Sequence, residues 1–201
     1  MPDAASKPPL VGERIVVIGN TNAGKSTLAA QLAELIDGKH VELDAIFWRT
    51  PGWQEPEPSE FQAAVRSSID ETPRWASSGN YFRHGAKDIL WPLADTLIWV
   101  DMPLWTVLPR VVRRSWRRWR DDELLWGTQR ENFWDHLKLW REESLIHFAI
   151  RYDRPKRRTY EAEFADPRWT HLQKYRLRSP RAVAAFVEAA RGSRASEAIR
   201  G

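Results

Sequence analysis

One eight-residue segment of the sequence, Gly19–Ser26, has residue types and spacing suited to holding phosphate groups. Its order, Gly-Asn-Thr-Asn-Ala-Gly-Lys-Ser, fits the pattern G-x4-G-K-[ST], with an apolar run before it and a helical pattern after it. In such a loop the backbone N–H groups surround a phosphate, the lysine lies beside the outer phosphates, and the hydroxyl faces Mg²⁺. We therefore expect ATP and Mg²⁺ to bind here. The candidate nucleotide-binding residues in this segment are Gly19, Asn20, Thr21, Asn22, Ala23, Gly24, Lys25, Ser26 and Thr27.

Two aspartates follow predicted strands and are candidates for metal or acceptor chemistry. Asp44 could bind Mg²⁺ through water or orient an acceptor hydroxyl, and the alternative is a capping role in a turn or helix. Asp101 precedes Met102 and Pro103, so a capping role competes with an outer-sphere role at the metal. Lys25 and Asp44 are catalytic candidates. The candidate metal-binding residues are Ser26, Asp44 and Asp101.

Six arginines lie within Arg110–Arg120, so this segment is strongly basic although the whole chain carries a net charge of only +4. The fork of an arginine suits the equatorial oxygens of a phosphoryl group in transfer. The alternative is a solvated helix face, which is usual for a run of charges. We select Arg113, Arg117 and Arg130 as catalytic phosphate contacts, and Arg83 as a contact for an anionic acceptor.

Hydrophobic patterns predict the elements that must position these residues. Apolar, often β-branched runs predict strands over residues 14–18, 40–43, 75–78, 96–100 and 171–177. Stripes at helical spacing predict helices over residues 25–36, 59–71, 104–119 and 132–150, and after Pro180. Alternating strands and helices are typical of a parallel sheet covered on both faces, with ligands beyond the carboxyl ends of the strands. Gly19, Asp44, Gly79 and Asp101 should therefore converge on one crevice.

Local signals refine two of the helices. Ser59 followed by Gln62 predicts a capping box at the start of the helix over residues 59–71. Pro109 predicts a kink or a later start in the helix over residues 104–119. Trp116 and Trp119 fall on the apolar stripe of that helix, so we expect them in the core. The five histidines have no metal-ligand spacing and are interpreted as structural.

Composition limits the other possibilities. The chain has no cysteine, which excludes disulfides, thiolate catalysis and cysteine-bound zinc. No apolar run approaches the ~20 residues that cross a bilayer, and the first ten residues lack a signal-peptide core, so we expect a cytoplasmic protein without membrane partners. Its 201 residues fit one α/β domain over 14–192, with a loose leader over 1–13 and a frayed tail over 193–201.

Several segments together resemble a known group of proteins. They are GNTNAGKSTLAAQLA (19–33), ELDAIFWRTPGWQEP (42–56), SGNY (78–81), LIWVDMP (97–103) and HLQKYRLRSPRAVAAF (171–186). These segments resemble the adenylate-kinase-like P-loop proteins known as DNA topology modulation or flagellar-regulation-related proteins. The resemblance implies a three-layer α/β/α P-loop NTPase fold with a five-stranded parallel sheet of the nucleoside-monophosphate-kinase type.

The resemblance also implies where substrates bind. It implies an acceptor-binding insertion over about residues 44–75 and an arginine-bearing lid over about residues 113–132. The adenine would lie near Ser179, Pro180 and Arg181. The implied acceptor-binding residues are Asp44, Trp48, Trp53, Asn80, Tyr81 and Arg83. The chain departs from the group at Ser78, where relatives have an aspartate, so Asp44 and Asp101 would have to supply the carboxylate chemistry.

Two functions remain in competition. The first is a Mg²⁺- and ATP-dependent kinase of a nucleotide or another small-molecule acceptor. The second is a nucleotide-dependent regulator that binds nucleic acid, supported by the sequence pI of about 9.6 and by arginines interleaved with Trp116 and Trp119. A third reading, a motor-type ATPase, is disfavoured because Leu97–Asp101 ends in a single aspartate followed by Met102. The sequence does not specify an oligomeric state.

Overall fold

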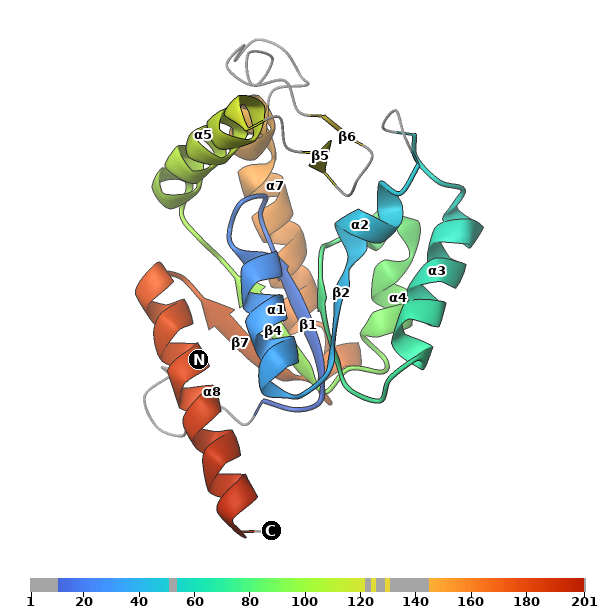
Figure 1. Ribbon diagram of the computed structural model, residues 1–201, viewed down its shortest axis with the longest axis vertical. Coiled ribbons are helices and arrows are strands. Elements are labelled where there is room, and N and C mark those ends of the chain that lie inside the picture. The colour runs from blue at the N-terminus through green and yellow to red at the C-terminus, as the bar shows by residue number, and fades with distance from the viewer. Residues whose placement is uncertain (1–10, 51–53, 122–123, 126–128, 131–144, 201) are drawn as a thin grey trace.

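The computed structural model describes residues 11–50, 54–121, 124–125, 129–130 and 145–200. Five parallel strands form a sheet in the order β2-β3-β1-β4-β7 (Figure 1). The strands are β1 (Arg14–Gly19), β2 (Lys39–Glu42), β3 (Trp75–Ser78), β4 (Thr96–Val100) and β7 (Gln173–Leu177). A separate antiparallel pair joins β5 (Leu124–Leu125) to β6 (Gln129–Arg130).

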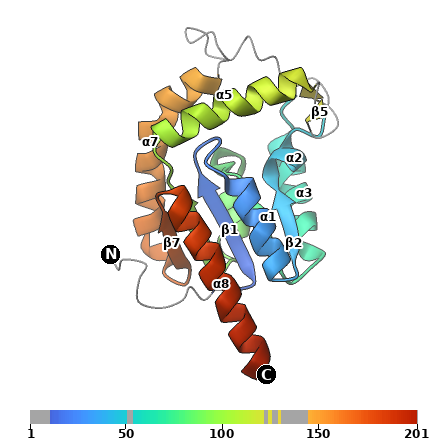
Figure 2. The ribbon, with the colours of Figure 1, turned by 60° about the vertical axis from the view of Figure 1, so that its left-hand side comes forward.

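Helices cover both faces of the sheet. They are α1 (Lys25–Leu35), α2 (Leu43–Phe47), α3 (Pro58–Asp70), α4 (Ala86–Leu90), α5 (Leu104–Arg120), α7 (Leu145–Ala165) and α8 (Pro180–Arg200), with short 3-10 helices at Phe82–His84 and Pro167–Trp169. One face packs against α1, α8 and the first half of α5, and the other against α3, α4 and α7 (Figures 1 and 2). The expected three-layer α/β/α fold with five parallel strands is confirmed.

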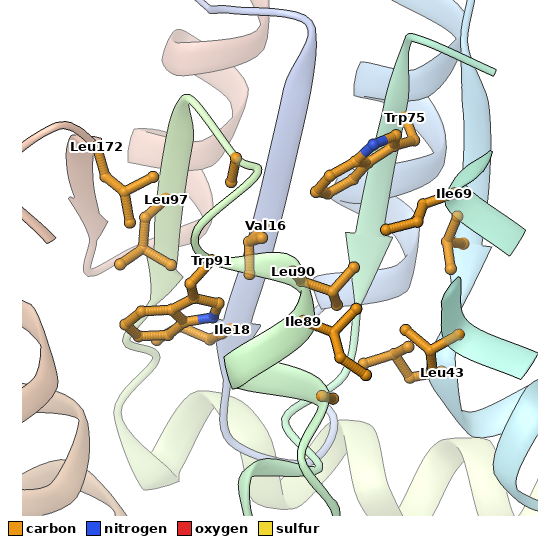
Figure 3. Close-up of a cluster of buried hydrophobic side chains, with 14 of the residues drawn as sticks. Val16, Ile18, Leu43, Ile69, Trp75, Ile89, Leu90, Trp91, Leu97 and Leu172 are labelled. Atoms are coloured by element: carbon orange, nitrogen blue, oxygen red, sulfur yellow. The ribbon is translucent and has the colours of Figure 1, made fainter. Parts of the chain in front are cut away.

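The central strand supplies side chains to both layers because successive residues of a strand point to opposite faces. Ile15 and Val17 pack on the side of α1, whereas Val16 and Ile18 pack on the side of α4. Figure 3 shows the cluster on the side of α4, in which Ile89 and Leu90 of α4 lie against side chains of the sheet. Strand β1 is therefore buried on both faces, as its uniformly apolar sequence predicts.

The second strand and the third helix differ from the prediction. Strand β2 ends at Glu42, and Leu43 already belongs to α2, which the sequence analysis did not predict. Helix α3 begins at Pro58, with Glu57 before it, and has no side-chain cap. The predicted capping box is therefore wrong, because proline starts the helix one residue before Ser59 and its fixed φ suits a first helical turn.

Helix ends also differ from expectation. Helix α5 starts at Leu104 and continues through Pro109. Helix α8 continues past Gly192 to Arg200, through the stretch where the sequence analysis expected a frayed tail. Val11 is buried and the N–H of Gly12 donates to Thr96 Oγ1 at 3.1 Å, so the last part of the expected leader is attached to the core.

The predicted helix over residues 132–150 lies largely outside the described residues, and α7 extends further, to Ala165. Within the described part of the chain, no helix combines the length and the apolar composition that a bilayer crossing requires.

We predict that Leu97→Ala lowers the free energy of unfolding by about 2–5 kcal/mol. Leu97 is fully buried in β4, so the shortened side chain leaves a cavity against α4 and α7. The matched control is Leu93→Ala, because Leu93 is 45% exposed and its truncation should change stability by only about 0.5 kcal/mol. Urea unfolding followed by tryptophan fluorescence measures both, and equal losses for the two variants would contradict this placement of the core.

Candidate active site

The segment Gly19–Ser26 forms a loop between the end of β1 and the start of α1. Gly19 has φ +150°, and a Cβ at this position would lie 2.4 Å from the carbonyl oxygen of Val100. Gly24 has φ +98° and precedes α1, and Asn22 also adopts a left-handed conformation at φ 58°. The first N–H groups of α1 therefore open into the loop, where helix geometry leaves them without helical acceptors. The strand–loop–helix context expected from the pattern is confirmed.

Positive charge gathers around this loop. Lys25 Nζ donates to the backbone oxygen of Asn20 at 2.9 Å. Burial lowers the pKa of Lys25, nearby Asp44 opposes this shift, and the charge of Arg114 adds to it. Arg110 Nη1 donates to the carbonyl oxygen of Ala23 at 3.4 Å. A polyphosphate fits this arrangement, because its negative charge would stabilise the ammonium and the neighbouring guanidinium groups.

Helix α5 crosses the carboxyl end of the sheet above the loop (Figure 2). Its Arg110 and Arg114 lie four residues apart and share one side of the helix, and this side faces the loop. The side chains of Arg113 and Arg117, which the sequence analysis selected, are exposed. The backbone of Arg130 lies in β6, and its side chain lies outside the described residues. The sequence shows the i, i+4 spacing of Arg110 and Arg114, but it does not show which side of the helix faces the loop.

Asp44 follows β2 directly, in the first turn of α2, within electrostatic reach of Lys25 in the loop. Tyr81 Oη donates to Asp44 Oδ1 at 2.6 Å. Burial and the Asp44 carboxylate raise the pKa of Tyr81 well above its usual value, so the phenol keeps its proton and remains a donor. Trp48, directly after α2, packs edge-on against Phe47 with ring centroids 4.8 Å apart. Three of the predicted acceptor-binding residues, Asp44, Trp48 and Tyr81, therefore lie together.

The other predicted acceptor residues lie elsewhere. The amide of Asn80 accepts from the N–H of Gly19 at 3.2 Å and donates to its carbonyl oxygen at 2.9 Å, so both polar groups hold the start of the loop. Tyr160 Oη also donates to this carbonyl oxygen, at 3.4 Å, a contact that sequence reasoning missed. Arg83 is exposed in the 3-10 helix, and Trp53 lies outside the described residues.

Ser78 has two partners that the sequence analysis did not assign. Ser78 Oγ lies within hydrogen-bonding distance of two groups: Ser26 Oγ at 3.3 Å and His40 Nε2 at 3.0 Å. Ser78 is almost completely buried at the end of β3. A chain of three side chains thus connects β2 and β3 to the first turn of α1.

Asp101 lies in an ion-pair network at the end of β4. One carboxylate oxygen lies 2.8 Å from Arg157 Nη2 and the other 2.8 Å from Arg176 Nη2. The guanidinium of Arg176 also stacks over the ring of Trp99, 3.8 Å from its centroid. A carboxylate between two guanidinium groups is poorly suited to bind Mg²⁺, and it links α7 and β7 to β4. Its metal role stays a prediction.

The remaining nucleotide-binding candidates surround the start of α8. Ser179 Oγ accepts from the N–H of Ala182 at 3.1 Å and caps the helix, and Pro180 is its first residue. Arg181 is exposed in the first turn. The helix expected after Pro180 is confirmed, and a contact with adenine remains a prediction.

Among the residues that the structure describes, no three His, Asp or Glu side chains gather as a metal site. Mg²⁺ in nucleotide-dependent enzymes is commonly held by one or two protein oxygens together with phosphate oxygens and water. The hydroxyl of Ser26 and the carboxylate of Asp44 are oxygen ligands of that kind: Ser26 follows Lys25 in the first turn of α1, and Asp44 lies within electrostatic reach of Lys25. These residues therefore fit Mg²⁺ bound together with a polyphosphate.

Comparisons with known proteins give little direct information about function. No protein-family model matches the chain, and no curated protein matches it. Among solved structures, a gluconokinase from Sinorhizobium meliloti 1021 aligns over 97% of each chain with 14% sequence identity and a TM-score of 0.45. The fold assignment rests on this chain's own features: the five-stranded parallel sheet, its helical layers and the glycine-containing loop between β1 and α1.

We predict that Asp101→Asn lowers the free energy of unfolding by about 2 kcal/mol, less than for fully buried pairs because Arg157 is 34% exposed. The concentration of Mg²⁺ that half-saturates ATP binding should not change, because the carboxylate is already held by arginines. Chemical denaturation and calorimetric titration measure the two quantities. A large rise in the Mg²⁺ requirement at unchanged stability would instead identify Asp101 as part of the metal site.

Proposed function

We propose that this protein is a kinase that transfers the terminal phosphoryl group of ATP to a small-molecule acceptor beside Asp44. The observation that carries the proposal is the position of Asp44, whose carboxylate is held by Tyr81 at 2.6 Å and acts electrostatically on Lys25. A phosphate-binding loop alone is compatible with binding or hydrolysis. A carboxylate beside the loop adds a group that can orient an acceptor and receive its proton.

In this proposal the donor's phosphates bind the loop. Backbone N–H groups at the start of α1 would bind the phosphate oxygens, while Lys25, Arg110 and Arg114 would stabilise the charge that develops during transfer. Ser26 and Asp44 would hold Mg²⁺, which supplies further neutralisation of phosphate oxygens when bound. The base of the nucleotide would lie toward the Ser179–Arg181 turn.

The acceptor would bind beside the Asp44 carboxylate, next to α2 and the segment after β3. Trp48 offers an apolar surface and Tyr81 keeps the Asp44 carboxylate in one orientation. Because Asp44 carries negative charge, this side favours a hydroxyl acceptor over a phosphate, which the carboxylate would repel. We extend the proposal to closure over the bound substrates by the acceptor segment, residues 44–75, and the lid, residues 113–132, because water must be excluded from the transfer.

We predict ATP turnover that depends on an acceptor, with hydroxylated small molecules more effective than nucleoside monophosphates. Lys25→Met should abolish ATP binding, because it removes the ammonium from the loop. In Asp44→Asn, Lys25 is unchanged and the nucleotide should still bind. The rate of transfer should fall by about 10²–10⁴-fold, because the variant lacks the general base. A coupled assay for ADP across an acceptor panel measures this, with calorimetry for binding. If no acceptor raises turnover above that of Lys25→Met, the protein is not a kinase.

A second candidate function is nucleic-acid binding along α5, and one correction favours it. The expectation that Trp116 and Trp119 lie in the core is wrong: each is 44% exposed, and Trp105 is 79% exposed. Trp105 and Trp119 are separated by fourteen residues, about four turns, so they lie on one side of the helix. The exposed Arg113 adjoins this side, and the guanidinium of Arg120 lies over the Trp116 ring, 4.8 Å from its centroid.

The second candidate predicts salt-sensitive binding of a single-stranded oligonucleotide. Its affinity should fall at least about tenfold between 50 and 200 mM salt, because arginines displace counterions from phosphates. Trp105→Ala should weaken binding by about tenfold through lost stacking, and Leu93→Ala, on another surface, should not. Fluorescence anisotropy measures these affinities. A response that is flat with salt would exclude this function.

A further inference from the structure

Three side chains from three elements form a hydrogen-bonded chain that ends at the phosphate-binding loop. His40 Nε2 lies 3.0 Å from Ser78 Oγ, which lies 3.3 Å from Ser26 Oγ. In the parallel pairing of β2 with β3, His40 is opposite Ala76 and Glu42 is opposite Ser78. His40 and Ser78 therefore lie on the same face of the sheet, the face covered by α1.

We propose that His40 is a positioning residue that acts through Ser78 to orient the hydroxyl of Ser26 toward the metal of the bound nucleotide. This inference rests on the proposed function, because it assumes that Ser26 contacts Mg²⁺ carried by ATP. It assigns a role to a histidine outside the phosphate-binding motif and to the serine that replaces the aspartate of the resembled group.

The chemistry follows from the donors and acceptors of a hydroxyl group. A hydroxyl has one proton to donate and two lone pairs, and it binds a cation through a lone pair. Its proton must then point away from the metal, toward an acceptor. In the structure the Ser78 hydroxyl donates to Ser26 Oγ at 3.3 Å, and the hydrogens of both hydroxyls can rotate. When a lone pair of Ser26 binds the metal, the direction of this bond reverses: Ser26 donates to Ser78 Oγ, and Ser78 must in turn donate its own proton to another group.

Burial makes His40 the partner that Ser78 needs. Ser78 is 1% exposed, so bulk water does not supply an alternative acceptor for its hydroxyl. A neutral imidazole accepts through one ring nitrogen, and Nε2 is the nitrogen beside Ser78. Burial lowers the pKa of His40, with Glu42 opposing the shift, which favours the neutral ring at physiological pH.

The competing explanation is that the contact only satisfies the polar groups of a half-buried histidine. That explanation predicts a change in stability when the contact is lost, but no change in the Mg²⁺ requirement. A positioning role predicts that loss of the contact raises the Mg²⁺ requirement, because a hydrogen bond that orients a metal ligand alters the affinity for the metal.

The test measures calorimetric ATP binding over a series of Mg²⁺ concentrations, using the full chain. His40→Leu and Ser78→Ala should each raise the Mg²⁺ concentration for half-maximal binding by about tenfold, without changing ATP binding in EDTA. The double variant should be no worse than either single variant, because both changes break one chain. His40→Gln should keep the Mg²⁺ concentration for half-maximal binding close to the wild-type value, since its amide oxygen can accept the same hydrogen bond.

The control is His171→Leu, because His171 is an exposed histidine whose Nε2 lies 3.2 Å from the carbonyl oxygen of Trp91, on another surface. This variant should keep the wild-type Mg²⁺ requirement. If His40→Leu and Ser78→Ala lower only the urea midpoint and keep that requirement, the inference is overturned while the kinase proposal stands. If the wild-type protein binds ATP without any dependence on Mg²⁺, or does not bind it, both proposals are overturned. Should His40→Leu fail to fold, Ser78→Ala alone breaks the same chain with a smaller change in volume.

Discussion

The pairing of β1 with β3 on one side and β4 on the other fixes the point from which the loop Gly19–Ser26 starts. Strand pairing ends near Gly19, and there the amide of Asn80 continues it by bonding both backbone groups of that glycine. A Cβ at Gly19 would collide with β4, so the two strands leave room only for glycine. The direction of the N–H groups at the start of α1 follows from this anchored exit.

Two aspartates at the carboxyl edge of the sheet, Asp44 and Asp101, have different surroundings. Asp44 meets a phenol and lies within electrostatic reach of Lys25, so its charge is directed at the loop. Asp101 is neutralised by Arg157 and Arg176 and ties α7 and β7 to β4. Both residues follow strands in the sequence, and only their partners distinguish a group available for chemistry from one that stabilises the fold.

Different sides of helix α5 face the core, the loop and the solvent. Val107 and Val111 pack on the core, Arg110 contacts the loop, and Trp105 faces solvent. Its position above the loop brings positive charge to the place where a polyphosphate would bind (Figure 2), whereas Trp105 on another side is 79% exposed.

Features that depend on near neighbours could be predicted from the residues alone: the loop motif at Gly19–Ser26, the buried strands at Trp75–Ser78 and Thr96–Val100, and the layered parallel fold. These features arise from backbone conformation and hydrophobic period, which are local. Three features required the packed structure: the side of α5 that faces the loop, the arginines that hold Asp101, and the link from His40 through Ser78 to Ser26. The reason is physical: those contacts join strands and helices far apart in the chain, and their geometry is set by how the elements pack rather than by residue type or spacing.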